Sequence, residues 1–311
     1  MSVTLIAAVV ALVLGHLAPA VAAGLRQYGW YGDWLRWLDT RLPASFWRGQ
    51  WGISLALLLP LLLVGLVQAA LEEPLLGFGG LLFGIAVLFY TWGPRDLDVD
   101  VDAIMDAPDP KARRAAAARL WPRTGTASLD GGALAEATFR SALRRWFGVL
   151  FWFLVLGAFG AMLYRLTQVA ADGIPEEASH DASAARSLPP ETLRGARTLL
   201  SVLEWPVAQL MTLALALVGN FDSVLGAWRS AGGTSFSLDN RFLGAAARAS
   251  VNSELAEEAA DYEGEEDQAR LDGIASVADL PELRDAMSLI WRSLLVWLAV
   301  LALFVIAGFV N

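Results

Sequence analysis

The chain contains no cysteine, only two histidines and a single lysine, Lys111. Without cysteine it can form no disulfide, thiolate metal site or cysteine nucleophile, and two histidines are too few for a histidine-rich zinc site. The lysine lies in Asp109-Pro110-Lys111-Ala112 and not in a Gly-x4-Gly-Lys-Ser/Thr loop, and no Gly-x-Ser-x-Gly motif occurs. These absences exclude a Walker-type nucleotide loop and the nucleophile elbow of serine hydrolases.

Charged side chains are also scarce. They make up 18% of the 311 residues, whereas 56% of the residues are apolar and the mean hydropathy is +0.49. Soluble domains are typically about 45–50% apolar. The net charge of −9 argues against nucleic acid as a partner, because phosphate contacts need a basic face. The composition therefore predicts an integral membrane protein whose principal partner is the lipid bilayer.

Long apolar runs set the expected architecture, because a helix needs about 20 apolar residues to cross a bilayer core. Four runs meet this length, and two more are interrupted by Pro19 or Pro206. The first run is interpreted as a retained membrane helix, because Met1–Thr4 lacks the Lys or Arg that precedes a signal-peptide core. We expect a single all-α, polytopic membrane domain over 1–311 with four to six membrane helices. The expected membrane segments are 3–23, 52–71, 75–92, 147–167, 199–219 and 289–309.

Arginine placement predicts the orientation in a bacterial inner (cytoplasmic) membrane. The turn Glu72–Pro74 between the second and third segments carries no cation, whereas arginines flank both segments. We expect the flanks, including a helical loop over 94–145, to be cytoplasmic and the turn to be periplasmic. Six crossings would make 221–288 cytoplasmic, and four would make 168–288 periplasmic. The acidic stretch 252–272 is predicted to be a solvated, disordered loop.

Three acids in the predicted cytoplasmic loop are candidate metal ligands. Asp98, Asp102 and Asp106 would share one face of a helix and could hold Mg2+ beside a phosphate. The alternative is a helix start, where carboxylates complement the helix dipole. No other cofactor is indicated.

Two arginines and one aspartate are the predicted ligand-binding residues. Arg140 and Arg144, spaced i, i+4 in front of an apolar run, could clamp an anion or simply obey the positive-inside rule. With six crossings, Asp222 returns to the same side, so these three residues would surround a cavity for an anionic or amide ligand. The same six-crossing reasoning places Glu204 and Tyr164 nearer the opposite ends of their helices. If 199–219 is instead re-entrant, the membrane helices do not fix that separation. No residue is assigned a catalytic role.

Small residues in the segment 147–167 predict close helix packing. Gly157, Gly160 and Ala161 form a small-residue face of the kind that lets membrane helices approach closely. Tyr164 follows one turn later, where its hydroxyl would need a partner inside the bundle.

Several blocks, taken in order, resemble those of the AmpE and CobD/CbiB membrane proteins, and the likeness runs through most of the chain. The blocks are Gly93-Pro94-Arg95-Asp96-Leu97, Leu150-Phe151-Trp152-Phe153, Gly157-Ala158-Phe159-Gly160-Ala161, Leu163-Tyr164-Arg165, Leu203-Glu204-Trp205-Pro206 and Leu217-Val218-Gly219-Asn220-Phe221-Asp222.

The two branches of this resemblance imply different functions. CobD/CbiB proteins carry acids before the Phe-Trp block, whereas Phe139–Arg145 contains no carboxylate here. The resemblance therefore favours AmpE. It implies a regulatory or signalling role in β-lactamase induction and cell-wall (peptidoglycan) stress, with recycling or signalling proteins as partners and no established reaction. The alternative is a membrane amide ligase of cobalamin biosynthesis, of the adenosylcobinamide-phosphate synthase type, which would use Mg2+ and a nucleotide.

Overall fold

The part of the protein that the computed structural model describes is mostly helical and contains no strand. That part comprises Ala7, Val10, Ala11, Gly24, Arg26 and residues 28–71, 77–93, 96–121, 127–173, 188–235, 237–262 and 280–307. The expectation of an all-α membrane protein is confirmed, because four helical stretches are long and apolar enough to cross a membrane. They are Gly52–Ala70, Gly131–Asp172, Pro190–Val218 and Pro281–Leu303.

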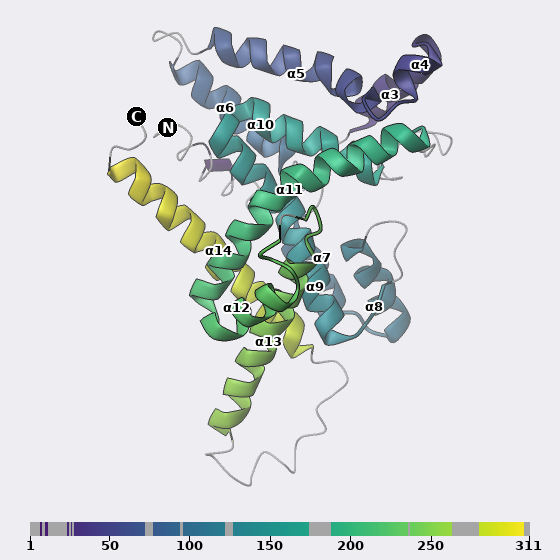
Figure 1. Ribbon diagram of the computed structural model, residues 1–311. Helices are drawn as coiled ribbons and strands as arrows, with labels where there is room; N and C mark the ends of the chain where they lie inside the picture. Colours follow the sequence, from purple (N-terminus) through teal and green to yellow (C-terminus); the bar gives the residue numbers. More distant parts are fainter. Residues whose placement is uncertain are drawn as a thin grey trace. The chain divides into compact units, whose positions relative to one another are not determined.

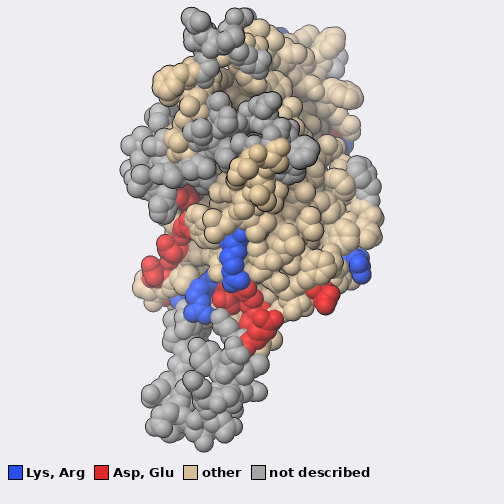
Figure 2. Space-filling view, turned by 90° about the vertical axis from the view of Figure 1, so that its left-hand side faces the viewer, with Lys and Arg blue, Asp and Glu red and all other residues tan. Residues whose placement is uncertain are grey.

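Large apolar side chains on these helices face outward. On α5 (Gly52–Ala70), Leu58 is 61% exposed and Leu66 is 59% exposed, and on α14 (Pro281–Ile306) Leu303 is 64% exposed. In Figure 2, most of the described surface on the viewed face carries no charge. A soluble protein rarely exposes apolar patches of this extent, whereas lipid tails accommodate them. The chain is therefore a multi-pass membrane protein.

The chain divides into two compact units. Unit 1 comprises residues 1–95, 144–204 and 302–311. Its helices are drawn in Figure 1, and α5 and α6 both pack against α10. The helices of unit 1 are α3 (Gly29–Arg41), α4 (Ala44–Trp47), α5, α6 (Gly77–Thr91), α10 (Gly148–Asp172) and the first half of α11 (Pro190–Val218).

The chain reverses direction inside α10. Gly157 has φ 66° and ψ −150°, a conformation that only glycine adopts readily, and helical arms lie on either side of it. A Cβ added to Gly160 would lie 2.1 Å from the carbonyl oxygen of Trp152. In a straight helix these two residues, eight positions apart, would be separated by two full turns. The two arms therefore form an antiparallel helical hairpin, and small residues allow their backbones to approach closely.

Unit 2 comprises residues 96–143 and 205–301. In it, α13 packs against both α12 and α9, and α7 packs against α8 and α9. Three of its helices begin at polar N-caps: Asp109 accepts from two backbone amides, and Asp130 and Asn220 accept from one each. The helices are α7 (Leu97–Met105), α8 (Pro110–Ala117), η2 (Ala118–Leu120), α9 (Gly131–Ala142), α12 (Phe221–Ser230), α13 (Arg241–Tyr262) and the remaining parts of α11 and α14.

The membrane segments differ from the expected set in two places. The segment 147–167 is not one straight helix, because the chain turns back at Gly157. In the described part of the segment 75–92, α6 has 15 residues and spans about 22 Å, less than the ~30 Å of a bilayer core. The interrupted run 199–219 is part of α11, a helix of 29 residues that continues through Pro206. The helix over 52–71 is α5 and that over 289–309 lies in α14, whereas 3–23 falls almost wholly outside the described residues.

Two predicted loops contain helices. The loop 94–145 holds α7, α8 and α9. The acidic stretch 252–272 was expected to be disordered, and this expectation is wrong for its first half, because α13 continues to Tyr262. Alanine and glutamate favour helix there, Val251 is buried, and Glu254 pairs with Arg292 at 2.9 Å. Residues 263–272 lie outside the described part.

Candidate functional site: the charged base of the hairpin

A buried charge cluster lies where the two arms of the α10 hairpin separate, within unit 1. Arg144, in a π-helical turn over Leu143–Phe147, donates from Nε to Oε1 of Glu204 at 2.7 Å. Its Nη1 donates to both carboxylate oxygens of Asp172, each at 3.2 Å. One guanidinium therefore joins the outgoing arm to the end of the returning arm and to the middle of α11.

The cluster is largely removed from solvent. The side chains of Arg144, Glu204 and Asp172 are 21%, 7% and 33% exposed. Charge-assisted hydrogen bonds of this kind are about twice as strong as neutral ones, and a low local dielectric strengthens them further. Removing one partner would leave an uncompensated buried charge, so the three groups act as a unit.

Tyr164 completes the cluster from the returning arm. It is fully buried, and its hydroxyl makes no hydrogen bond within the described structure. Its ring lies against Gly148, where an added Cβ would be 2.2 Å from Cζ of the tyrosine. Glycine at position 148 thus makes room for the ring.

Two arginines and a tyrosine cap the C-terminus of α6 beside this cluster. Arg165, which is 1% exposed, donates from Nε to the carbonyl of Thr91 at 2.6 Å. Arg26 donates to the carbonyls of Phe89 at 3.0 Å and Gly93 at 2.9 Å. The hydroxyl of Tyr28 donates to the carbonyl of Tyr90 at 2.9 Å. The last carbonyls of a helix lack partners inside the helix and carry partial negative charge, so cationic donors stabilise them.

The predicted ligand-binding residues have different neighbours. Arg140 donates to Oε1 of Glu136 at 2.7 Å, within unit 2, whereas Arg144 engages Glu204 and Asp172 within unit 1. The π-helical turn that contains Arg144 has more residues per turn than an α-helix, so the simple i, i+4 face expected from the sequence does not hold.

Asp222 lies in a separate pocket of about 390 Å³ in unit 2. Two residues that line the pocket, Arg292 and Glu254, form an ion pair at 2.9 Å. Burial raises the pKa of Glu254 above its usual 4.5, and the nearby guanidinium opposes this shift. Figure 2 shows acidic and basic side chains lying side by side on the viewed face. The pocket is lined by Val218, Gly219, Asn220, Phe221, Asp222, Glu254, Glu257 and Arg292.

The residues predicted to pack helices lie in the hairpin itself. Gly157 forms the reversal, Gly160 faces the opposite arm, and Ala161 and Tyr164 are fully buried. Their close packing therefore joins two arms of one hairpin, where the sequence pattern suggested contact between separate membrane helices.

The three candidate magnesium ligands lie on α7 and at its end. Asp98 accepts a hydrogen bond from the indole of Trp291 at 3.1 Å, and Asp102 and Asp106 are exposed. Across the residues that the structure describes, no group of three or more histidine or acidic side chains is close enough to hold a metal ion.

Glu204 and Tyr164 were expected far from Arg144, and this expectation is wrong. It assumed a straight helix over 147–167, whereas the reversal at Gly157 returns Tyr164 to the level of Gly148. Asp172 was missed for the same reason. Gln68 was also missed, and its position in an otherwise apolar run was the available signal.

Comparison of the chain with protein-family models, with curated proteins and with solved structures finds no match.

The charge cluster at the base of the hairpin holds two carboxylates and a buried phenol around the guanidinium of Arg144. Such an arrangement can fix three helical segments in one state, and it can release them when one pairing is lost.

Proposed function

We propose that this chain is an inner-membrane modulator of the AmpE type, which couples cell-wall damage to β-lactamase induction. The proposal rests on the resemblance of sequence blocks and is supported by a contact between two of those blocks in unit 1. Trp152, in one block, donates from Nε1 to the carbonyl of Leu203, in another, at 3.0 Å. The next residue, Glu204, pairs with Arg144. Blocks that share such contacts act as one structural element.

The pairing of the carboxylates supports a regulatory role. Glu204 and Asp172 both bind the guanidinium of Arg144, at 2.7 and 3.2 Å. An ion-paired cluster between helical segments suits a two-state element that a signal can bias.

The proposed setting is the bacterial inner membrane, with the arginine-rich flanks in the cytoplasm. Partners would be proteins of cell-wall recycling or signalling. A reporter fused after Trp121 should read as cytoplasmic, and a tag inserted at Glu72–Pro74 should be labelled from the periplasm. A periplasmic reading after Trp121 would overturn this orientation.

The test of function is complementation of a deletion strain exposed to a sub-inhibitory β-lactam. The strain should lose β-lactamase induction and should grow without added corrinoid, and the wild-type gene should restore induction. Asp172→Asn, at the partly exposed edge of the cluster, should accumulate normally and restore induction poorly. Glu191→Gln is the matched control, because Glu191 forms only a surface pair with Arg194 on α11.

Two results would contradict the proposal. Corrinoid auxotrophy of the deletion strain would point to the amide ligase, and unchanged induction in that strain would remove the regulatory role. Asp222→Asn in the same assay tests the pocket of unit 2: lost induction at normal abundance would move the functional site there.

A further inference from the structure

The break in α10 is supported by a side chain from another helix. Nε2 of Gln68, on α5, donates to the carbonyl of Leu156 at 3.3 Å, and its Oε1 accepts from the amide of Phe159 at 3.0 Å. These backbone groups flank Gly157, where the helical φ and ψ angles are interrupted. In lipid such groups must be satisfied within the protein. One amide side chain satisfies both, so the reversal is a specific feature of the fold.

The arms of the hairpin are too short to cross a bilayer separately. The apolar part of the outgoing arm, residues 146–156, is about 16 Å long, and the returning arm, residues 158–172, is about 22 Å long, against ~30 Å for a bilayer core. Runs of this length are typical of re-entrant segments.

The start of the outgoing arm and the end of the returning arm lie next to each other. Arg144 at the start of the outgoing arm binds Asp172 at the end of the returning arm. At the other end of the hairpin, Gln68 lies less than one turn before the end of α5 at Ala70. The tip of the hairpin and its base are thus at opposite ends of unit 1.

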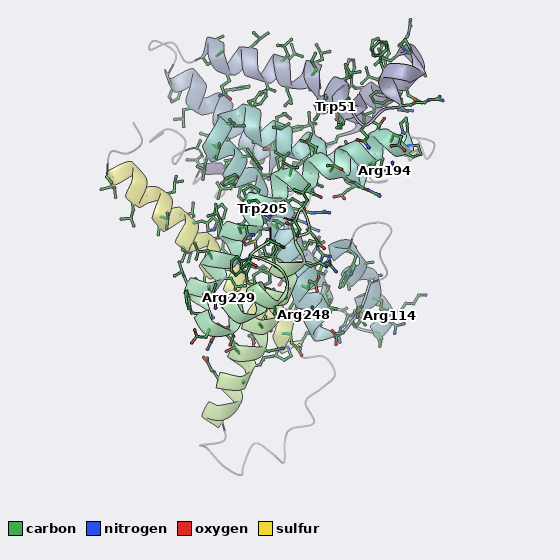
Figure 3. The ribbon with its side chains drawn as sticks, in the orientation of Figure 1. Trp51, Arg114, Arg194, Trp205, Arg229 and Arg248 are labelled. Atoms are coloured by element: carbon green, nitrogen blue, oxygen red, sulfur yellow. The ribbon has the colours of Figure 1, made fainter. Side chains whose placement is uncertain are left out.

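The start of α11, which follows the hairpin in the sequence, lies beside the start of α5. Thr192, near the start of α11, donates to the carbonyl of Trp47 at 2.6 Å. A Cβ added to Gly195 would lie 2.1 Å from the carbonyl oxygen of Gln50. Figure 3 shows Trp51 and Arg194, on these two elements, at the same end of unit 1.

We propose that residues 144–172 form a re-entrant hairpin, which enters and leaves the membrane through the same face and is fixed at its tip by Gln68. Arg144, Arg145 and Arg165 all lie in the part of the hairpin near its base, and this excess of arginine marks that face as cytoplasmic. The proposal does not depend on the regulatory function, because it concerns only the path of the chain.

The proposal has a direct consequence for sidedness. Ser128, before the hairpin, and Glu191, after it, lie on the same side of the membrane. A single straight helix over 147–167 would put them on opposite sides.

The natural absence of cysteine allows a test by single-cysteine labelling in the full-length chain. Ser128→Cys and Glu191→Cys are each treated with a membrane-impermeant maleimide, in intact cells and in inverted membrane vesicles. Glu72→Cys serves as the reference for the periplasmic side. Both Ser128→Cys and Glu191→Cys should be labelled in vesicles, with labelling lost in intact cells, and Glu72→Cys should show the reverse.

Labelling of Ser128→Cys and Glu191→Cys from opposite sides would overturn the proposal. If Glu191→Cys fails to accumulate, Arg194→Cys takes its place, because Arg194 is 63% exposed on the same turn of α11. A loss of β-lactamase induction in any of these variants would leave the sidedness result unaffected, so the two proposals fail separately.

Discussion

Arg144 and Asp172 are 28 residues apart in the sequence, yet Nη1 of the arginine lies 3.2 Å from each carboxylate oxygen of the aspartate. A continuous helix would separate them by about 42 Å. They meet because the chain reverses at Gly157, and the same reversal brings Tyr164 against Gly148. The charge cluster therefore exists only as a consequence of the hairpin.

Replacing Gly157 with alanine should destabilise the protein. In a straight helix this change favours folding, because alanine is the better helix former. At φ 66° it introduces strain of about 1–3 kcal/mol, and the new Cβ would lie 2.8 Å from Nε2 of Gln68. Thermal unfolding of the purified protein in detergent measures the effect. Gly226→Ala is the control, since nothing lies within 4 Å of its Cβ position, and it should leave the transition unchanged or raise it. A stabilised Gly157→Ala would contradict the hairpin.

Replacing Gln68 with leucine should loosen the tip of the hairpin. The carbonyl of Leu156 and the amide of Phe159 would lose their partner, at a cost of about 1–3 kcal/mol each. Hydrogen exchange at the Phe159 amide should accelerate, whereas Leu66→Met, at an exposed position on the same helix, should not change it. Equal exchange rates in wild type and Gln68→Leu would show that the side chain does not support the break.

The sequence was sufficient for the helical membrane class but not for the reversal. Gly157, Gly160 and Ala161 give the same spacing whether small residues pack two separate helices or two arms of one, so periodicity could not distinguish the cases. The choice depends on Gln68, 89 positions from Gly157, which is a tertiary contact. The acidic residues before Tyr262 likewise suggested a loop, because the pairing of Glu254 with Arg292 on a distant helix was not visible in the sequence.

Replacing Arg144 with glutamine should be the most damaging change in the cluster. It removes the guanidinium that Glu204, whose side chain is 7% exposed, binds at 2.7 Å, and breaking a buried pair in this way costs about 3–5 kcal/mol. Asp172→Asn should cost less, because that side chain is 33% exposed. The double variant Arg144→Gln with Glu204→Gln should be more stable than Arg144→Gln alone. Additive losses in this unfolding series would mean that the two charges are not coupled.

The stability of unit 2 should depend on pH through Glu254. Burial raises the pKa of its carboxyl above 4.5, although Arg292 opposes the shift. Because the folded-state pKa is the higher one, its contribution to stability is complete below pH 4.5 and is lost as pH rises through the folded-state pKa. Glu254→Gln stays neutral and should flatten this fall in the free energy of unfolding. Asp102→Asn, at an exposed acid on α7 of the same unit, should keep the wild-type slope. Identical slopes for wild type and Glu254→Gln would contradict the assignment.

The path of the chain between Arg145 and Asp172 can be measured directly as a distance. Nitroxide labels at Arg145→Cys and Asp172→Cys are introduced into the cysteine-free chain, and pulsed electron paramagnetic resonance records their separation in lipid. Asp172 is a suitable labelling site because its side chain is partly exposed. When it is replaced, Arg144 can still pair with Glu204. The hairpin predicts a distance less than half of the about 40 Å that a continuous helix imposes over these residues. A distribution centred near 40 Å would contradict the reversal at Gly157 and, with it, the charge cluster that the reversal builds.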